Sequence, residues 1–177
     1  LLGGKKVNVW AARISYVGES GWEIYFNNNK DDGLALYDSL LEVGVVPVGI
    51  ETYANSRRLE KSFRLQGADL ETEYTAIEAA IQRPLVKEAD FHGKAAHLSH
   101  REEDPCAILC TMTLDDLSVS GVPRYPVGIS PIIDPATGEV PIDNKGRRSY
   151  TTGMSYCPSI KKFVVMGYLP KELAIQG

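Results

Sequence analysis

Long hydrophobic runs are absent from the sequence, which holds no stretch of about 18 apolar residues that could cross a bilayer as a helix. Cysteine is scarce, and Cys106, Cys110 and Cys157 form no C-x-x-C pair, so neither a disulfide framework nor a zinc ribbon is indicated. Positive charge is not in excess, since 19 Lys and Arg stand against 23 Asp and Glu for a net charge of −4. We therefore expect a reducing compartment, and neither membrane nor nucleic acid among the partners.

Several motifs of cofactor and catalytic sites are also missing. The sequence contains no Gly-x-Gly-x-x-Gly, no P-loop and no Gly-x-Ser-x-Gly, so it predicts neither a nucleotide-binding fold nor a serine nucleophile. The three histidines, His92, His97 and His100, are interpreted as surface residues, because a metal site needs ligands that converge on one point. No metal is expected.

The composition is that of a globular protein. Of 177 residues, 44% are hydrophobic and 24% charged, which suits one domain of common size or two small ones. A polar, proline-ended connection at residues 98–105 predicts two domains, residues 1–100 and residues 101–177. The chain opens at Leu1 without an initiator methionine, so we expect it to be a piece of a longer protein.

The first half mixes strand and helix patterns. Alternating apolar residues predict half-buried strands at 7–11 and 22–26. A helix should begin near Asp31 and end before Gly44, since its apolar residues form one stripe, Leu34, Tyr37, Leu40 and Leu41.

Two further helices are expected in this half. One covers residues 57–63, and another begins at Thr75, where Glu78 completes a capping box, and ends before Pro84. Four charged residues of the first are interpreted as a structural ion-pair network: Arg57, Arg58, Glu60 and Lys61.

The second half is predicted to be all-β. Residues 107–114, 127–133 and 162–169 are short apolar stretches, and turn sequences occur at 134–138 and 143–146. The expected fold class is α+β, in which a partial ferredoxin-like antiparallel sheet with helices precedes a small all-β barrel or sandwich domain.

The segment around residues 13–25 carries the strongest indication of function. If residues 18–21 form the loop of a hairpin, Tyr16 and Glu23 face each other across an antiparallel pair. A carboxylate beside an aromatic ring suits a flat heterocycle with adjacent N–H donors, such as guanine, a pterin or an amidine-like ring. The alternative is that Glu23 is solvated and Tyr16 only packs.

The same segment resembles a known family. Residues 13–24, RISYVGESGWEI, are similar to the motif of the glycine cleavage T-protein (aminomethyltransferase) superfamily, in the form seen in folate domains of sarcosine and dimethylglycine dehydrogenases. Other motifs follow in the order and rough spacing of that family: Arg58–Lys61, Gly67–Leu70, Thr75–Ala79, Asp90–Lys94, Ser149–Gly153, Cys157–Lys162 and Met166–Pro170. The resemblance spans nearly the whole chain and covers the middle and C-terminal parts of the family only.

The resemblance implies a tetrahydrofolate-dependent one-carbon transferase or demethylase component, in which a methyl, methylene or aminomethyl carbon passes from a small amine to folate. In that family the glutamate at the position of Glu23 holds the pterin edge, and the tyrosine at the position of Tyr16 lines the same pocket. The catalytic aspartate of the family belongs to an N-terminal segment with no counterpart here. The catalytic residue is therefore unknown, and we expect this chain alone to be inactive.

The resemblance also sets expectations for partners and location. These are an amine or methyl donor such as a glycine derivative, the missing N-terminal region of the same protein, and FAD, where one is used, on another segment. The location implied is cytoplasmic, or the mitochondrial matrix in a eukaryote. Residues 53–56 lack the arginine of T-proteins proper, which is closer to the dehydrogenase-associated branch. A folate-binding module without transfer chemistry, serving as scaffold or sensor, is the alternative.

Overall fold

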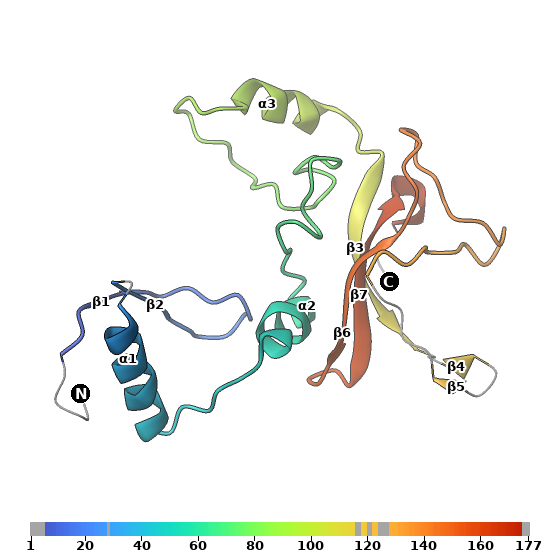
Figure 1. Ribbon diagram of the computed structural model, residues 1–177. Helices are drawn as coiled ribbons and strands as arrows, with labels where there is room; N and C mark the ends of the chain where they lie inside the picture. The colour runs from blue at the N-terminus through green and yellow to red at the C-terminus, as the bar shows by residue number, and fades with distance from the viewer. Residues whose placement is uncertain (1–5, 28, 116–117, 120–121, 124–127, 175–177) are drawn as a thin grey trace.

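The computed structural model describes residues 6–27, 29–115, 118–119, 122–123 and 128–174, and it is an α+β fold as predicted (Figure 1). Among these residues no helix is long and apolar enough to cross a membrane. The elements in chain order are β1 (Val9–Ala12), β2 (Glu23–Phe26), α1 (Lys30–Glu42), the π-helix η1 (Glu51–Arg57), α2 (Arg58–Glu60), α3 (Lys94–Glu102), β3 (Ala107–Leu114), β4 (Ser118–Val119), β5 (Val122–Pro123), β6 (Thr151–Cys157), β7 (Lys162–Pro170) and the 3₁₀ helix η2 (Lys171–Leu173).

The larger sheet is antiparallel, in the order β3–β7–β6. Strand β3 pairs along its whole length with β7, from Ala107 opposite Pro170 to Leu114 opposite Phe163. The predicted strands at 107–114 and 162–169 are thus confirmed. Within the described part of the chain these three strands form one open sheet, so the barrel or sandwich predicted for the second half is not confirmed.

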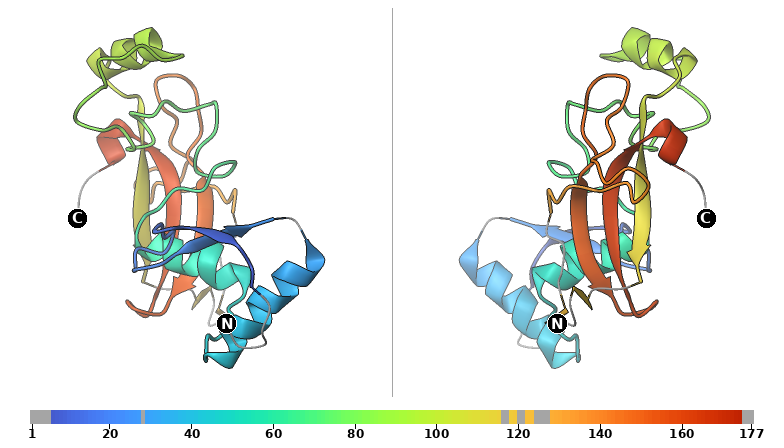
Figure 2. Two further views of the ribbon diagram at one scale, coloured as in Figure 1. Left: turned by 90° about the vertical axis from the view of Figure 1, so that its left-hand side faces the viewer. Right: turned by 90° about the vertical axis from the view of Figure 1, so that its right-hand side faces the viewer.

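The N-terminal elements form a separate layer of the molecule. Strands β1 and β2 make a two-stranded antiparallel sheet, which confirms the two predicted strands. The half-burial predicted for them is wrong, since most of their residues are exposed. Helix α1 begins after Asn29, whose side chain accepts a hydrogen bond from the Asp31 N–H, and Gly44 follows it at φ +90°. The predicted helix is confirmed, but α1 has no buried residue. In Figures 1 and 2, α1 lies away from the three-stranded sheet, and η1 and α2 pack against β6 and β7.

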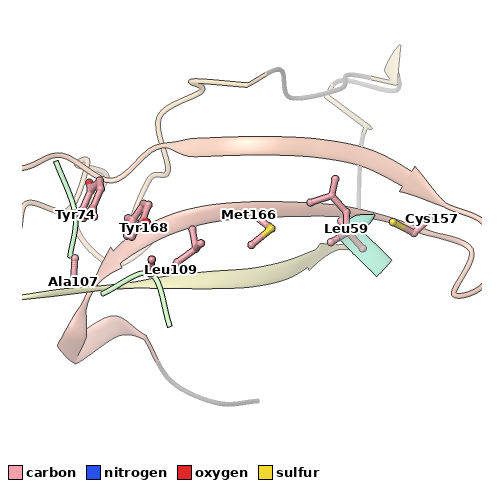
Figure 3. Packing of buried hydrophobic residues seen from close by; sticks show 9 residues of the cluster. Leu59, Tyr74, Ala107, Leu109, Cys157, Met166 and Tyr168 are labelled. Carbon is pink, nitrogen blue, oxygen red and sulfur yellow. The ribbon is translucent and has the colours of Figure 1, made fainter. Parts of the chain in front are cut away.

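The main hydrophobic core lies on one face of the larger sheet (Figure 3). Towards one end of the cluster Tyr74 stacks on Tyr168, with ring planes 3° from parallel and centroids 3.5 Å apart. Residues from both sides of position 101 make up the cluster: Leu59, Tyr74, Ala79, Ala107, Leu109, Cys157, Val164, Met166 and Tyr168. The division into 1–100 and 101–177 stays a prediction, and this core is shared across it.

A buried ion pair lies at the junction of η1–α2 with the sheet. The Arg58 guanidinium is 2.5 Å from the Asp69 carboxylate, and the side chains are 1% and 0% exposed. Arg58 also donates to the carbonyls of Ala54 and Phe63, at 2.6 and 2.9 Å. Asp69 accepts from the Leu65 N–H at 2.8 Å. The pair is thus surrounded by hydrogen-bond partners, which offset the cost of burying charge.

A second network joins the two halves through Arg147. Its guanidinium contacts Glu78 at 2.5 Å and Asp143 at 2.6 Å, and it lies 4.3 Å from the centre of the Tyr74 ring. The predicted capping box is confirmed, because the Thr75 N–H donates to Glu78 and the Glu78 N–H to the Thr75 hydroxyl. The helix predicted to follow is wrong, since residues 76–80 form turns and Glu78 is held by Arg147 instead.

Two other helix predictions need correction. The helix predicted over 57–63 ends at Glu60, since Ser62 has φ +55°, outside the helical region. The polar residues 98–102 belong to α3 rather than to an irregular connection, because their turns extend a helix that begins at Lys94. The turns at 134–138 and 143–146 are confirmed by hydrogen bonds from the N–H groups of Gly138 and Gly146.

Lowering the pH should weaken the fold through Glu78 and Asp143. Burial alone raises their pKa values, but hydrogen bonds from Arg147 and from backbone N–H groups outweigh it and hold both below the ordinary range. Their contribution is therefore complete above the unfolded pKa of about 4 and is lost as the pH falls through the folded values. We expect urea unfolding to show constant stability from pH 7 to about 5 and a decline below about 4.

The variant Arg147→Met serves as the control for this pH dependence. It should lower the free energy of unfolding by about 3–5 kcal/mol at pH 7, because two buried carboxylates lose their partner. The loss of stability below about pH 4 should then be smaller than in the parent. An unchanged acid transition in this variant would contradict the assignment.

A methyl group at Gly167 should destabilise the sheet. A Cβ there would lie 2.6 Å from the Tyr150 carbonyl oxygen and 2.9 Å from Cδ1 of Ile132. We expect Gly167→Ala to lower the free energy of unfolding by about 1–3 kcal/mol. Gly49→Ala is the matched control, since nothing lies within 4 Å of that Cβ, and it should stay within about 0.5 kcal/mol of the parent. Equal free energies of unfolding for the two variants would show that the sheet accommodates a methyl group at Gly167 without strain.

Candidate functional site

The connection between β1 and β2 is longer than the sequence predicts. Ala12 lies opposite Glu23 and Val9 opposite Phe26, so residues 13–22 form the connection. The four-residue loop at 18–21, with Tyr16 facing Glu23, is therefore wrong. Strand β1 stops early because the Ile14 N–H donates back to the Ala12 carbonyl at 2.9 Å, which turns the chain away from the ladder.

Tyr16 packs against the segment that follows α2. Its hydroxyl donates to the Arg64 carbonyl at 2.7 Å. Its ring lies 5.8 Å from that of Tyr53 in η1 and 6.1 Å from that of Phe63, nearly parallel to the latter. Burial raises the pKa of the Tyr16 phenol, so it is neutral at physiological pH. The sequence missed Tyr53 and Phe63, since no spacing rule relates aromatic residues on three separate segments.

The same connection is fastened to η1 and α2 by two more contacts. Glu19 forms an ion pair with Arg57 at 2.5 Å. Gly18, at φ +70°, lies so close to Lys61 that a Cβ on it would be 2.7 Å from the lysine Cδ and Cε. Arg57 also contacts Glu60 at 2.9 Å, so the ion-pair interpretation of this charged cluster is confirmed for these two residues, whereas Arg58 pairs with Asp69.

Glu23 lies at the start of β2 and is only partly buried. The Tyr25 hydroxyl, two residues along on the same face, donates to its Oε2. This hydrogen bond, the largest cause, raises the pKa of Tyr25. The Tyr25 ring lies 5.0 Å from that of Trp10 on β1. Glu23 is thus an oriented carboxylate whose neighbour is Tyr25 rather than Tyr16, and Tyr25 in turn contacts Trp10.

A shallow hollow of about 340 Å³ lies on this sheet, lined by Trp10, Tyr25 and residues beside them, Asn8, Val9, Phe26 and Asn27. Both rings are exposed, Trp10 at 64% and Tyr25 at 49%. Glu23 is not among the residues that line this hollow, and its carboxylate is joined to it through the Tyr25 hydroxyl. The two exposed rings offer a surface on which a flat ligand could stack.

Nucleophilic and metal chemistry find little support in the described residues. Burial raises the pKa of Cys157 to about 11 and also raises that of Cys110, so both are protonated at neutral pH. No group of three or more His, Cys, Asp or Glu side chains converges anywhere in the part of the chain that the structure describes.

Comparison with known proteins places these residues in context. Residues 3–88 match the family described as GCVT N-terminal domain. Human mitochondrial dimethylglycine dehydrogenase is 33% identical over 97% of the chain, which spans 18% of that protein. Aminomethyltransferase of Koribacter versatilis is 31% identical over 93% of the chain, which spans 41% of it.

The fold gives the same relationship. The crystal structure of glycine cleavage system aminomethyltransferase T from Bartonella henselae superposes with a TM-score of 0.71 at 27% identity, covering 94% of this chain and 43% of that one. The chain thus spans less than half the length of these relatives. The chain belongs to the glycine cleavage T-protein superfamily and corresponds to part of the length of these relatives.

Proposed function

We propose that this chain is the folate-binding part of a tetrahydrofolate-dependent one-carbon transferase or demethylase component. Its donor would be a small amine such as a glycine derivative. The names of the relatives, aminomethyltransferase and dimethylglycine dehydrogenase, support this reaction class. The observation that carries the proposal is the partly exposed carboxylate of Glu23, oriented by the hydroxyl of Tyr25, whose ring contacts that of Trp10.

The residues present fit a reduced pterin. The Glu23 carboxylate can accept two N–H groups from one edge of the ring, and the Tyr25 hydroxyl keeps the carboxylate in place. Bound tetrahydrofolate would supply the nitrogen atoms that accept the one-carbon unit. Tyr16 would contribute its ring rather than its proton, because its hydroxyl already donates to the Arg64 carbonyl.

The acid–base group of the reaction is proposed to come from outside these residues. The buried thiols are protonated at neutral pH, and the carboxylates of Asp69, Glu78 and Asp143 are occupied by arginines in the core. We accordingly propose that the chain alone turns over no substrate. FAD, where the complete protein uses it, would be held by another segment.

Replacing Glu23 by glutamine should weaken tetrahydrofolate binding by about ten-fold or more, since a charge-assisted contact of about 1.5–3 kcal/mol is lost. Calorimetry on the full-length polypeptide measures this, with its melting temperature as a check on folding. Glu42→Gln, at the end of α1, is the matched control and should bind as the parent does. Unchanged affinity in a folded Glu23→Gln protein would reject the proposal.

Replacing Tyr16 separates the ring from the hydroxyl. Tyr16→Phe removes the bond to the Arg64 carbonyl and should cost about 1 kcal/mol of stability, with less than a three-fold change in folate affinity. Tyr16→Ala also removes the ring and should weaken binding about ten-fold or more. An aromatic contact of about 1–1.5 kcal/mol, together with the lost apolar burial, accounts for this change. Equal losses of affinity in the two folded variants would instead place the hydroxyl against the ligand.

A further inference from the structure

A second hollow, remote from Tyr16 and Glu23 in the sequence, lies between residues 81–91 and α3. Its volume is about 380 Å³, within the range of small-molecule sites. One set of lining residues is apolar: Ile81, Leu85, Val86 and Phe91. Leu85 is 87% exposed and Ile81 is 45% exposed, so apolar surface in the hollow is open to solvent.

The walls of this hollow are fastened to each other by hydrogen bonds. Arg101 of α3 donates to the carbonyls of Arg83 and Pro84, at 2.7 and 3.0 Å. Lys94, at the start of the helix, donates to the Glu88 carbonyl at 2.5 Å. The segment is thus held to α3 at two points, and Figure 1 shows both standing clear of the three-stranded sheet.

The polar side chains that line the hollow carry mostly one sign of charge. Arg83, Lys87 and His97 line it, together with Gln82, and no carboxylate does. Within the described residues none of the three basic side chains forms an ion pair, and the interaction found for Lys87 is with the Phe91 ring, 4.9 Å from its centre. Positive charge outside the ion pairs of the described residues, beside exposed apolar surface, favours an anion with an apolar body.

We propose that this hollow binds a small carboxylate with an aromatic or branched apolar body. The carboxylate would meet the guanidinium of Arg83 and the ammonium of Lys87, while the apolar body would pack between Leu85, Ile81 and Phe91. The site goes beyond the proposed folate site and shares none of its residues. A macromolecular anion is disfavoured by the net charge of −4 and by the small volume.

The test compares three small probes on the chain: phenylacetate, phenylacetamide and acetate. We expect saturable binding of phenylacetate, followed by amide chemical shifts and by calorimetry, with shifts concentrated at residues 81–91 and in α3. Phenylacetamide, which lacks the charge, and acetate, which lacks the ring, should each bind at least ten-fold more weakly. Equal binding of phenylacetate and phenylacetamide would overturn the proposal, and so would equal binding of phenylacetate and acetate.

Variants distinguish this site from the folate site. Lys87→Gln and Arg83→Gln should each weaken phenylacetate binding about five- to ten-fold, and neither removes a hydrogen bond seen in the described structure. Lys30→Gln, an exposed lysine at the start of α1, is the matched control. Glu23→Gln should leave phenylacetate binding unchanged, so this proposal can fail or succeed independently of the folate assignment. Full affinity in both Lys87→Gln and Arg83→Gln would overturn it.

Discussion

The buried pair of Arg58 and Asp69 is the constraint on which the arrangement of the molecule depends. Removing two charges from water is costly, and the cost is offset only if every donor and acceptor keeps its partner. Those partners come from η1, from the turn after α2, and from β6, where the Thr152 hydroxyl donates to Asp69. Gly153 leaves room for the guanidinium, since a Cβ there would lie 2.8 Å from Nη2. The turn after α2 is therefore fixed, and with it the carbonyl that holds Tyr16.

The candidate folate site is thus built from two unequal parts. Tyr16 is held by the turn that the buried pair fixes, whereas Glu23 is oriented by Tyr25 within the two-stranded sheet. The connection at 13–22 links them, fastened by the Glu19–Arg57 ion pair and the close approach of Gly18 to Lys61. Ligand binding would depend on how this connection is held as well as on the two side chains.

The sequence predicted well what neighbouring residues decide. Alternation located the strands at 9–12 and 23–26, and the Thr75–Glu78 capping box was predicted from spacing alone. The predictions from sequence were wrong where residues distant in the chain determine the structure. Tyr16 bonds to the Arg64 carbonyl instead of lying in the hairpin ladder, and Arg147 holds Glu78 where a helix was expected. Glu23 was predicted to lie beside an aromatic ring, but the ring is that of Tyr25, two residues along the same strand, and not that of Tyr16, because β1 ends before Tyr16 can pair with β2.

The absence of buried residues from α1 has a consequence for local stability. Three of its apolar side chains, Leu34, Tyr37 and Leu41, are exposed, and so is the segment from Val43 to Ile50 that leads from it to η1. Little apolar area is therefore regained when this helix closes, and its opening free energy should fall well below that of β7, whose residues 164–168 are buried. In amide hydrogen exchange α1 would be an early-opening unit, exchanging through local fluctuations while the β3–β7–β6 sheet exchanges only when the whole chain unfolds.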